Sequence, residues 1–188
     1  MKESKAGRRG EALGAAALAA IACALCACIA VTSGCGRPAE DVVREGVAEG
    51  FEQLKRHEGP EYAAAVEALE AEADLASLGL TAEEFCDAWL DGFDYEIRGV
   101  RVDGPGAVVD AVLAVRSVDD AFRSFEEGIA ERAADGGLAD EGVGGLLLEA
   151  LRSAPLKEVE VEMPYVLAEG EWAPGPGFES ELARAFAS

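Results

Sequence analysis

Residues 94–116 read DYEIRGVRVDGPGAVVDAVLAVR, and their pattern decides the fold. Apolar residues upstream recur at helical spacing, whereas from Asp94 onward the period falls to two. A turn with two glycines and a proline occupies 103–106, and a nearly all-apolar run follows at 107–116. The stretch therefore predicts a β-hairpin whose second strand is central in a sheet. We expect one side of the first strand to carry Tyr95, Ile97, Gly99 and Arg101, and the other Glu96, Arg98, Val100 and Val102.

Helical periodicity dominates on both sides of this hairpin. Gly59-Pro60 separates the first two helices, and Thr81 with Glu84 forms a capping-box pattern at the start of the third. The expected elements are helices at 38–57, 60–78 and 81–93, the hairpin, helices at 117–135 and 138–151, strands at 157–163 and near 172, and a helix at 178–186. This order predicts an α+β fold, in which N-terminal helices pack on a small, curved antiparallel sheet of about four strands with a helical insertion between its hairpins.

The N-terminus has the pattern of a secretory signal. Lys2, Lys5, Arg8 and Arg9 precede an uncharged run at 12–36 that includes Val31-Thr32-Ser33-Gly34-Cys35. A basic head, an apolar stretch and small residues before the cleavage point are typical of such signals. A cysteine directly after the small residues makes this one resemble a bacterial lipobox, in which the cysteine is diacylated and becomes the first residue of the mature chain.

We therefore expect a signal peptide at 1–34, a lipid-anchored tether at 35–39 and a single α+β domain at 40–188. Cys35 would be the lipidated residue, and the domain would lie on the extracytoplasmic face of the cell membrane. A retained transmembrane anchor and a plain cleaved signal are the alternatives, because about 20 apolar residues suffice to cross a bilayer. The alanine-rich composition of the run favours the lipoprotein. Thr32 departs from the pattern, since lipoboxes usually carry Leu three residues before the cysteine.

The mature chain would be strongly acidic. The whole chain has 16 Lys and Arg against 37 Asp and Glu; four of the former and two of the latter precede Cys35, which leaves a net charge of −23. Such a surface repels nucleic acid and anionic headgroups, so no nucleic-acid partner is expected. Cys86 would be the only other cysteine after cleavage, so no intrachain disulfide is expected.

Two short motifs carry a resemblance to a known group of proteins. They are Val100-Arg101-Val102-Asp103-Gly104 at the hairpin turn and Gly170-Glu171-Trp172 near the C-terminus. With the lipobox and the helices, they make residues 40–187 resemble uncharacterised lipoproteins of Gram-positive bacteria that carry a cystatin-like or NTF2-like cone domain. That family has no established catalytic residues, so the resemblance implies a fold and a location but no reaction. Pro174 and Pro176 cut the last strand short, which departs from the family plan.

A cone-like α+β domain can leave an apolar pocket between sheet and helices. The aromatic residues expected to line it are Trp89, Phe93, Tyr95, Phe122, Phe125 and Trp172. The first hypothesis for function is therefore a membrane-anchored binding or accessory module for a small apolar ligand or a protein partner. The alternative interpretation of these residues is that they simply fill the core.

Two further hypotheses remain open. One is a small enzyme with a buried carboxylate, Asp91 or Asp110, as general base beside Tyr95 or Tyr165; the other is a structural envelope protein with an acidic shell. His57 is the only histidine and Cys86 has no basic neighbour, so neither metal nor nucleophilic chemistry is predicted, and no cofactor is expected. Asp87 and Asp91 are four residues apart and so share one helix face, but such pairs are common in an acidic chain.

Overall fold

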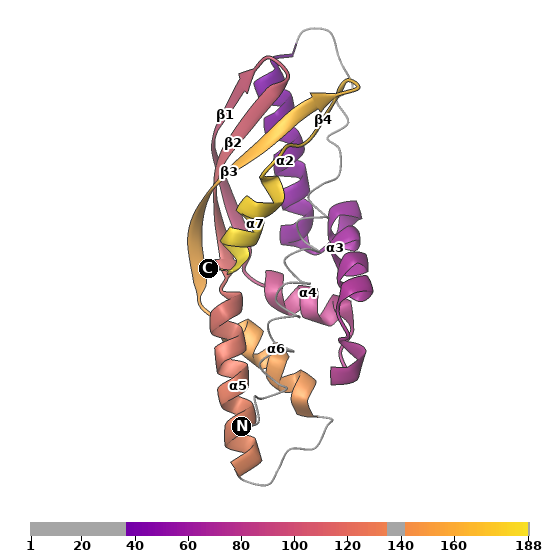
Figure 1. Cartoon of the computed structure of the whole chain (residues 1–188), viewed down its shortest axis with the longest axis vertical. Coiled ribbons are helices and arrows are strands. Elements are labelled where there is room, and N and C mark those ends of the chain that lie inside the picture. The colour runs from indigo at the N-terminus through magenta and orange to yellow at the C-terminus, as the bar shows by residue number, and fades with distance from the viewer. Residues whose placement is uncertain (1–36, 135–141, 188) are drawn as a thin grey trace.

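The computed structural model describes residues 37–134 and 142–187, and it confirms the α+β fold (Figure 1). Six α-helices, one short 3₁₀ helix and four strands are present in these residues. Their order is α2 (Ala39–Arg56), α3 (Gly59–Glu72), η1 (Ala76–Leu78), α4 (Ala82–Leu90), β1 (Asp94–Asp103), β2 (Gly106–Arg116), α5 (Val118–Ala134), α6 (Val143–Ser153), β3 (Leu156–Ala168), β4 (Glu171–Pro174) and α7 (Phe178–Ala187).

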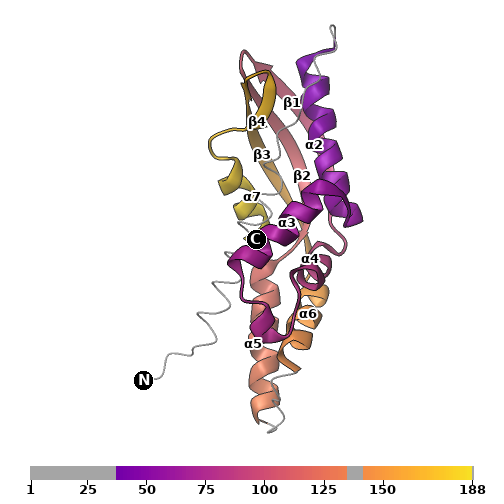
Figure 2. The same cartoon turned by 90° about the vertical axis from the view of Figure 1, so that its right-hand side faces the viewer.

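The strands form one antiparallel sheet in the order β1-β2-β3-β4. The predicted central strand is confirmed, since β2 pairs with β1 on one side and β3 on the other. Alternate residues of β2, among them Val109 and Leu113, are fully buried because α2 and α7 cover that face of the curved sheet (Figures 1 and 2). The opposite face of the sheet carries charged side chains, which pair across the strands as Arg98 with Glu160 and Arg101 with Asp110 and Glu162.

The expected strict alternation along β1 is wrong after Ile97. The register with β2 shifts between Ile97 and Gly99, so Ile97 lies opposite Ala111 while Gly99 lies opposite Asp110. This β-bulge adds one residue and reverses the alternation, which places Val100 and Val102 on the core side together with Ile97. The reason is burial, because strict alternation would have turned both valines to solvent and Arg101 to the core.

The insertion between β2 and β3 consists of two helices that continue beyond the end of the sheet (Figure 1). At the start of α5, the Ser117 hydroxyl accepts a hydrogen bond from the backbone N–H of Asp120. The second helix of the insertion, predicted at 138–151, corresponds to α6. Residues 138–141 of that prediction lie outside the described residues. Gly144 of α6 faces the loop before α4, where a Cβ atom would lie 2.4 Å from the carbonyl oxygen of Leu78.

Strand β3 is longer than expected and passes through Pro164. The ring lies opposite Val108 on β2, and the Pro164 carbonyl accepts a hydrogen bond from Gly175 just after β4. Proline is tolerated here because β4 pairs with β3 only from Tyr165 onward. The short fourth strand and the terminal helix are as the sequence predicted.

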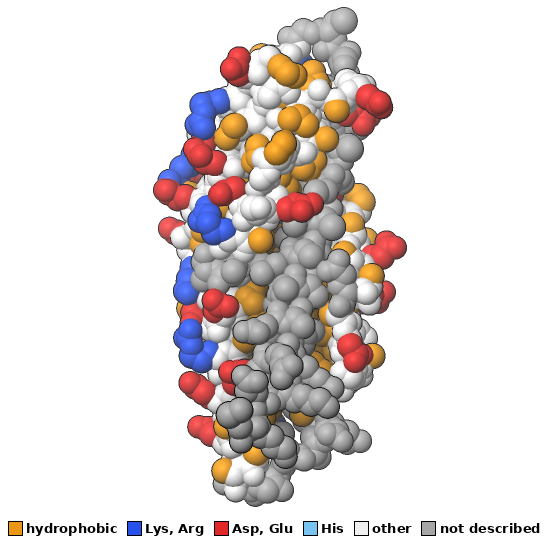
Figure 3. Space-filling view, in the orientation of Figure 1, with side chains coloured by type: hydrophobic (Ala, Val, Ile, Leu, Met, Phe, Trp, Pro, Cys, Tyr) orange, Lys and Arg blue, Asp and Glu red, His pale blue; other side chains and the backbone are white. Residues whose placement is uncertain are grey.

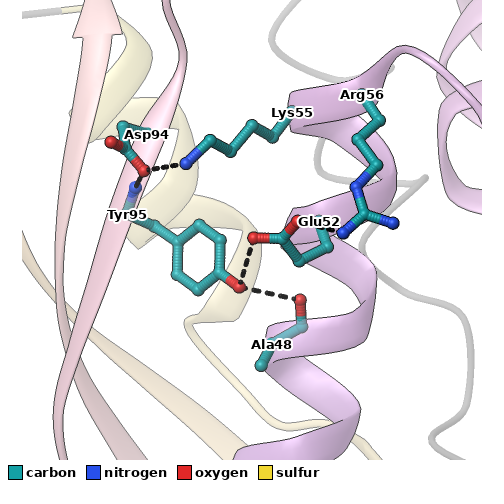
Figure 4. A network of polar contacts seen from close by, with 6 residues as sticks. All are labelled: Ala48, Glu52, Lys55, Arg56, Asp94 and Tyr95. Carbon is teal, nitrogen blue, oxygen red and sulfur yellow. Dashed lines mark hydrogen bonds and ion pairs between the residues drawn. The ribbon is translucent and has the colours of Figure 1, made fainter.

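Helix α2 runs antiparallel to β1 and packs along it. The Tyr95 hydroxyl, near the start of β1, donates to the Ala48 carbonyl at 3.1 Å and lies 3.2 Å from Glu52 (Figure 4). Further along β1, the Arg44 guanidinium donates to the Ile97 carbonyl at 3.1 Å. As β1 advances, the α2 residues that it contacts come earlier in the helix. The start of α2 therefore lies at the end of the sheet where β1 turns into β2.

Candidate functional site

Three of the six aromatic residues predicted to line a pocket lie in one cluster. The Trp89 ring is 5.2 Å from the Phe186 ring, Phe93 is 6.3 Å from the same ring, and Tyr95 is 5.0 Å from Phe51. Phe51 and Phe93 complete the chain of contacts at 5.9 Å. Residues from α2, α4, β1 and α7 thus meet between the sheet and the helices.

The other three predicted residues lie elsewhere. Phe122 and Phe125 are on α5 and Trp172 is on β4, elements at opposite ends of the elongated molecule (Figure 1). The ring contacts of the described residues join none of the three to the cluster around Phe186. The set that the sequence proposed therefore does not surround a single volume, although Trp89, Phe93 and Tyr95 remain candidates for a smaller site.

Within this cluster, polar atoms differ in whether they have partners. Tyr95 is satisfied by Ala48 and Glu52, and burial together with the Glu52 hydrogen bond raises its pKa to about 12. The indole N–H of Trp89, which is only 2% exposed, has no acceptor among the described residues. A buried indole N–H usually finds a partner. Trp89 is thus the member of the cluster whose polar atom is left unsatisfied by the described residues.

The carboxylates proposed as general bases are held in ion pairs. The Asp91 side chain is 59% exposed and lies 2.8 Å from the Arg116 guanidinium, which also donates to the Asp91 carbonyl. Asp110 pairs with Arg101 on the charged face of the sheet, whereas Tyr165 points to the core side of β3. The predicted enzyme arrangement, a buried carboxylate facing a pocket beside Tyr95 or Tyr165, is not found in the described part of the chain.

A cluster that sequence reasoning missed joins His57, Tyr62 and Asp87. The Tyr62 hydroxyl donates to Asp87 Oδ1 at 2.7 Å, and His57 Nδ1 lies 2.9 Å from the same oxygen. The two rings stack with centroids 5.6 Å apart. Burial, followed by the hydrogen bond to Asp87, raises the pKa of Tyr62. No sequence signal indicates this contact, because 30 residues separate His57 from Asp87.

This cluster links the junction of α2 and α3 to α4 and has no nucleophile in an activated form. The neighbouring Cys86 is buried, and burial raises the pKa of its thiol to about 12, so it stays protonated and unreactive at neutral pH. In the described residues no group of three or more His, Cys, Asp or Glu side chains is placed to hold a metal ion. The contacts of His57 and Asp87 join the end of α2 and the start of α3 to α4.

A third feature lies at the end of the sheet where α2 begins. Leu167 N–H donates to the Pro105 carbonyl at 2.7 Å, which brings the end of β3 against the β1–β2 turn. Val166 and Leu167 are 36% and 42% exposed, and with Leu156 they are the large apolar residues that the described surface leaves most open. Figure 3 shows hydrophobic side chains gathered over this end, which we call the hairpin end: residues 103–106 and 166–171.

No helix in the described ranges is both long and apolar enough to cross a membrane. The predicted lipidation site, Cys35, lies outside the described residues.

Comparison with known proteins gave little similarity. No protein-family model matches the chain, and no curated protein matches it. Among solved structures, the chain is similar to a "putative lipoprotein" (ycdA) of Bacillus subtilis, with 14% identity and a TM-score of 0.43. The match covers 78% of this chain and 46% of that one, so the chain spans about half the length of that protein. We therefore infer function from the residues themselves.

Proposed function

We propose that the protein is an extracytoplasmic lipoprotein, diacylated at Cys35, whose α+β domain serves as a binding or accessory module at the membrane surface. The observation that carries the proposal is the N-terminal pattern: four basic residues, an uncharged run and small residues before Cys35. Cleavage there would leave only 36–38 between the lipidated cysteine and helix α2, which begins at Ala39. A tether this short would hold the domain close to the bilayer.

A binding or accessory role, rather than catalysis, agrees with the contacts of the candidate carboxylates. Asp91 and Asp110 both pair with arginines, and Cys86 is a buried, protonated thiol. Neither carboxylate lies in a buried pocket beside a tyrosine, as a general base of the kind considered above would require. The acidic surface disfavours polyanionic ligands, and the ligand that we propose is a protein partner or a small apolar molecule.

The anchor is tested by changing Cys35 to Ala in the full chain and feeding cells a fatty-acid analogue. The wild type should be labelled, and Cys35→Ala should lose all labelling, because the thioether carries the diacylglyceryl group. Cys86→Ala is the matched control, since it removes the other cysteine of the mature chain and should leave labelling unchanged. Equal labelling of wild type and Cys35→Ala would show that the lipobox interpretation is wrong.

A further inference from the structure

We propose that the C-terminal helix α7 closes the open edge of β3 with the side chain of Arg184, and that opening this edge lets the β3 strands of two copies pair. The inference concerns a contact that the proposed function does not use. It holds whether or not Cys35 carries a lipid.

The first step concerns the edge itself. Strand β4 pairs with β3 only over residues 165–168. In the described part of the chain, residues 156–164 of β3 therefore have a strand neighbour on one side alone, namely β2. The unpaired backbone N–H and C=O groups of such an edge are a template for pairing with another chain.

The direction of the backbone groups follows from Pro164. Its carbonyl accepts a hydrogen bond from the Gly175 N–H, just after β4, and so points away from β2. Residues two apart in a strand direct their backbone groups to the same side. The groups at the open edge are therefore those of Glu158, Glu160 and Glu162.

The second step concerns what occupies this edge. The Arg184 guanidinium of α7 donates to the Glu160 carbonyl at 2.7 Å, and the same nitrogen lies 2.8 Å from Glu181 Oε2. The hydrogen bond from Arg184, with a smaller contribution from the Glu162 N–H, lowers the pKa of Glu181. The acceptor at the middle of the edge is thus already used, and a carboxylate lies near the next donor.

Packing holds α7 in the position that this contact needs. The side chains of Phe178, Leu182 and Phe186 are at most 2% exposed and belong to the core, and α7 lies alongside β3 (Figure 1). Glu181 and Arg184 are three residues apart and so share one side of the helix. The core contacts of α7 therefore keep this pair against the edge.

The third step concerns charge, which is a weaker barrier between copies than the backbone contact. Glutamates line the outer face of β3, and like charges on paired strands repel. However, Arg98 pairs with Glu160, and Arg101 pairs with Glu162, so these two carboxylates are already balanced within one chain. The contact from Arg184 is therefore the main obstacle to pairing.

The test uses intact cells that express two full-length copies with different epitope tags, each with a photoreactive benzophenone side chain in place of Glu158. In the Arg184→Ala variant, cross-linked dimers that carry both tags should rise by roughly tenfold, the ratio that one hydrogen bond to a charged group is worth. The Arg184 side chain is 52% exposed, so the variant should keep its fold.

The matched control carries the probe in place of Glu127, which is exposed on α5, a helix that continues beyond the end of the sheet (Figure 1). Arg184→Ala should leave the cross-links from this position unchanged, whereas unfolding would raise them too.

A double variant, Arg184→Ala/Glu162→Pro, tests whether pairing runs through β3. Proline cannot donate to a partner strand, and at an edge it leaves the ladder to β2 intact, so the Glu158 cross-links should return to the wild-type level. Three results would each overturn the inference: Glu158 cross-links that Arg184→Ala does not change, an equal rise at Glu127, or a rise that Glu162→Pro does not reverse.

Discussion

Two neighbouring glycines in the first turn of α6 should respond in opposite directions to the same substitution. A Cβ atom at Gly144 would lie 2.4 Å from the Leu78 carbonyl oxygen and 2.9 Å from Leu80 Cγ, whereas one at Gly145 would meet nothing within 4 Å. Because the Leu78 carbonyl belongs to the backbone, the clash that Gly144→Ala creates is relieved only if α6 or the turn at Leu78 moves. Gly145→Ala removes backbone freedom from the unfolded chain at no steric cost.

The magnitudes follow from these contacts. Overpacking a core typically costs about 1–3 kcal/mol, and a clash with backbone belongs at the upper end of that range. The higher helix propensity of alanine offsets up to about 1 kcal/mol of this cost. The net effect is that Gly144→Ala should lower the free energy of unfolding by about 2 kcal/mol. Gly145→Ala should raise it by about 0.5–1 kcal/mol.

Urea denaturation followed by tryptophan fluorescence would measure both variants, since Trp89 and Trp172 are buried in the folded domain. The slope of free energy against urea should be the same for wild type and both variants if only stability changes. If Gly144→Ala is as stable as Gly145→Ala, the close packing of α6 against the turn at Leu78 is wrong.

Three further predictions concern single side chains. Burial and the charge of Glu49 raise the pKa of Glu61, so its contribution to stability is fully present below the ordinary glutamate pKa of 4.5 and is lost as the pH rises through the folded pKa. The Glu61→Gln variant should therefore lose less stability than the wild type between about pH 4.5 and 7, and equal losses in urea titrations would contradict this. Tyr95→Phe removes the hydrogen bond to Ala48 and should cost about 1 kcal/mol in the same assay, whereas an unchanged midpoint would show that the bond contributes nothing. The Cys86 thiol should react with a disulfide reagent at pH 8 only after unfolding, and stoichiometric reaction of the native protein would refute its burial.

Local patterns in the sequence predicted most of the fold. The period of two that begins at Asp94 and the apolar run at 107–116 correspond to the two strands of the predicted hairpin. The Thr81–Glu84 capping box corresponds to the capped start of α4. The bulge after Ile97 could not be predicted, because it depends on which side of β1 the helices cover. A periodic pattern gives the faces of an element but not the neighbour that buries one of them.

The candidate sites were harder to predict for a related reason. The sequence grouped six aromatic residues, yet only Trp89, Phe93 and Tyr95 belong to one cluster, since aromatic content says nothing about distance in space. The contact between His57 and Asp87 depends on how α3 and α4 pack, which no single segment encodes. Val166 and Leu167 lay beyond the strand predicted at 157–163, and only the structure shows that β3 continues through them and leaves both exposed.

The bulge in β1 also bears on how copies of the protein behave beside one another. An uncovered outer strand is a template on which a second molecule can pair and aggregate. Here β1 is interrupted at Arg98, and Arg44 already occupies the Ile97 carbonyl. The opposite margin consists of the short β4, which ends at Pro174, and of β3 before Tyr165, where Arg184 donates to the Glu160 carbonyl. These contacts should hinder pairing between the sheets of two copies.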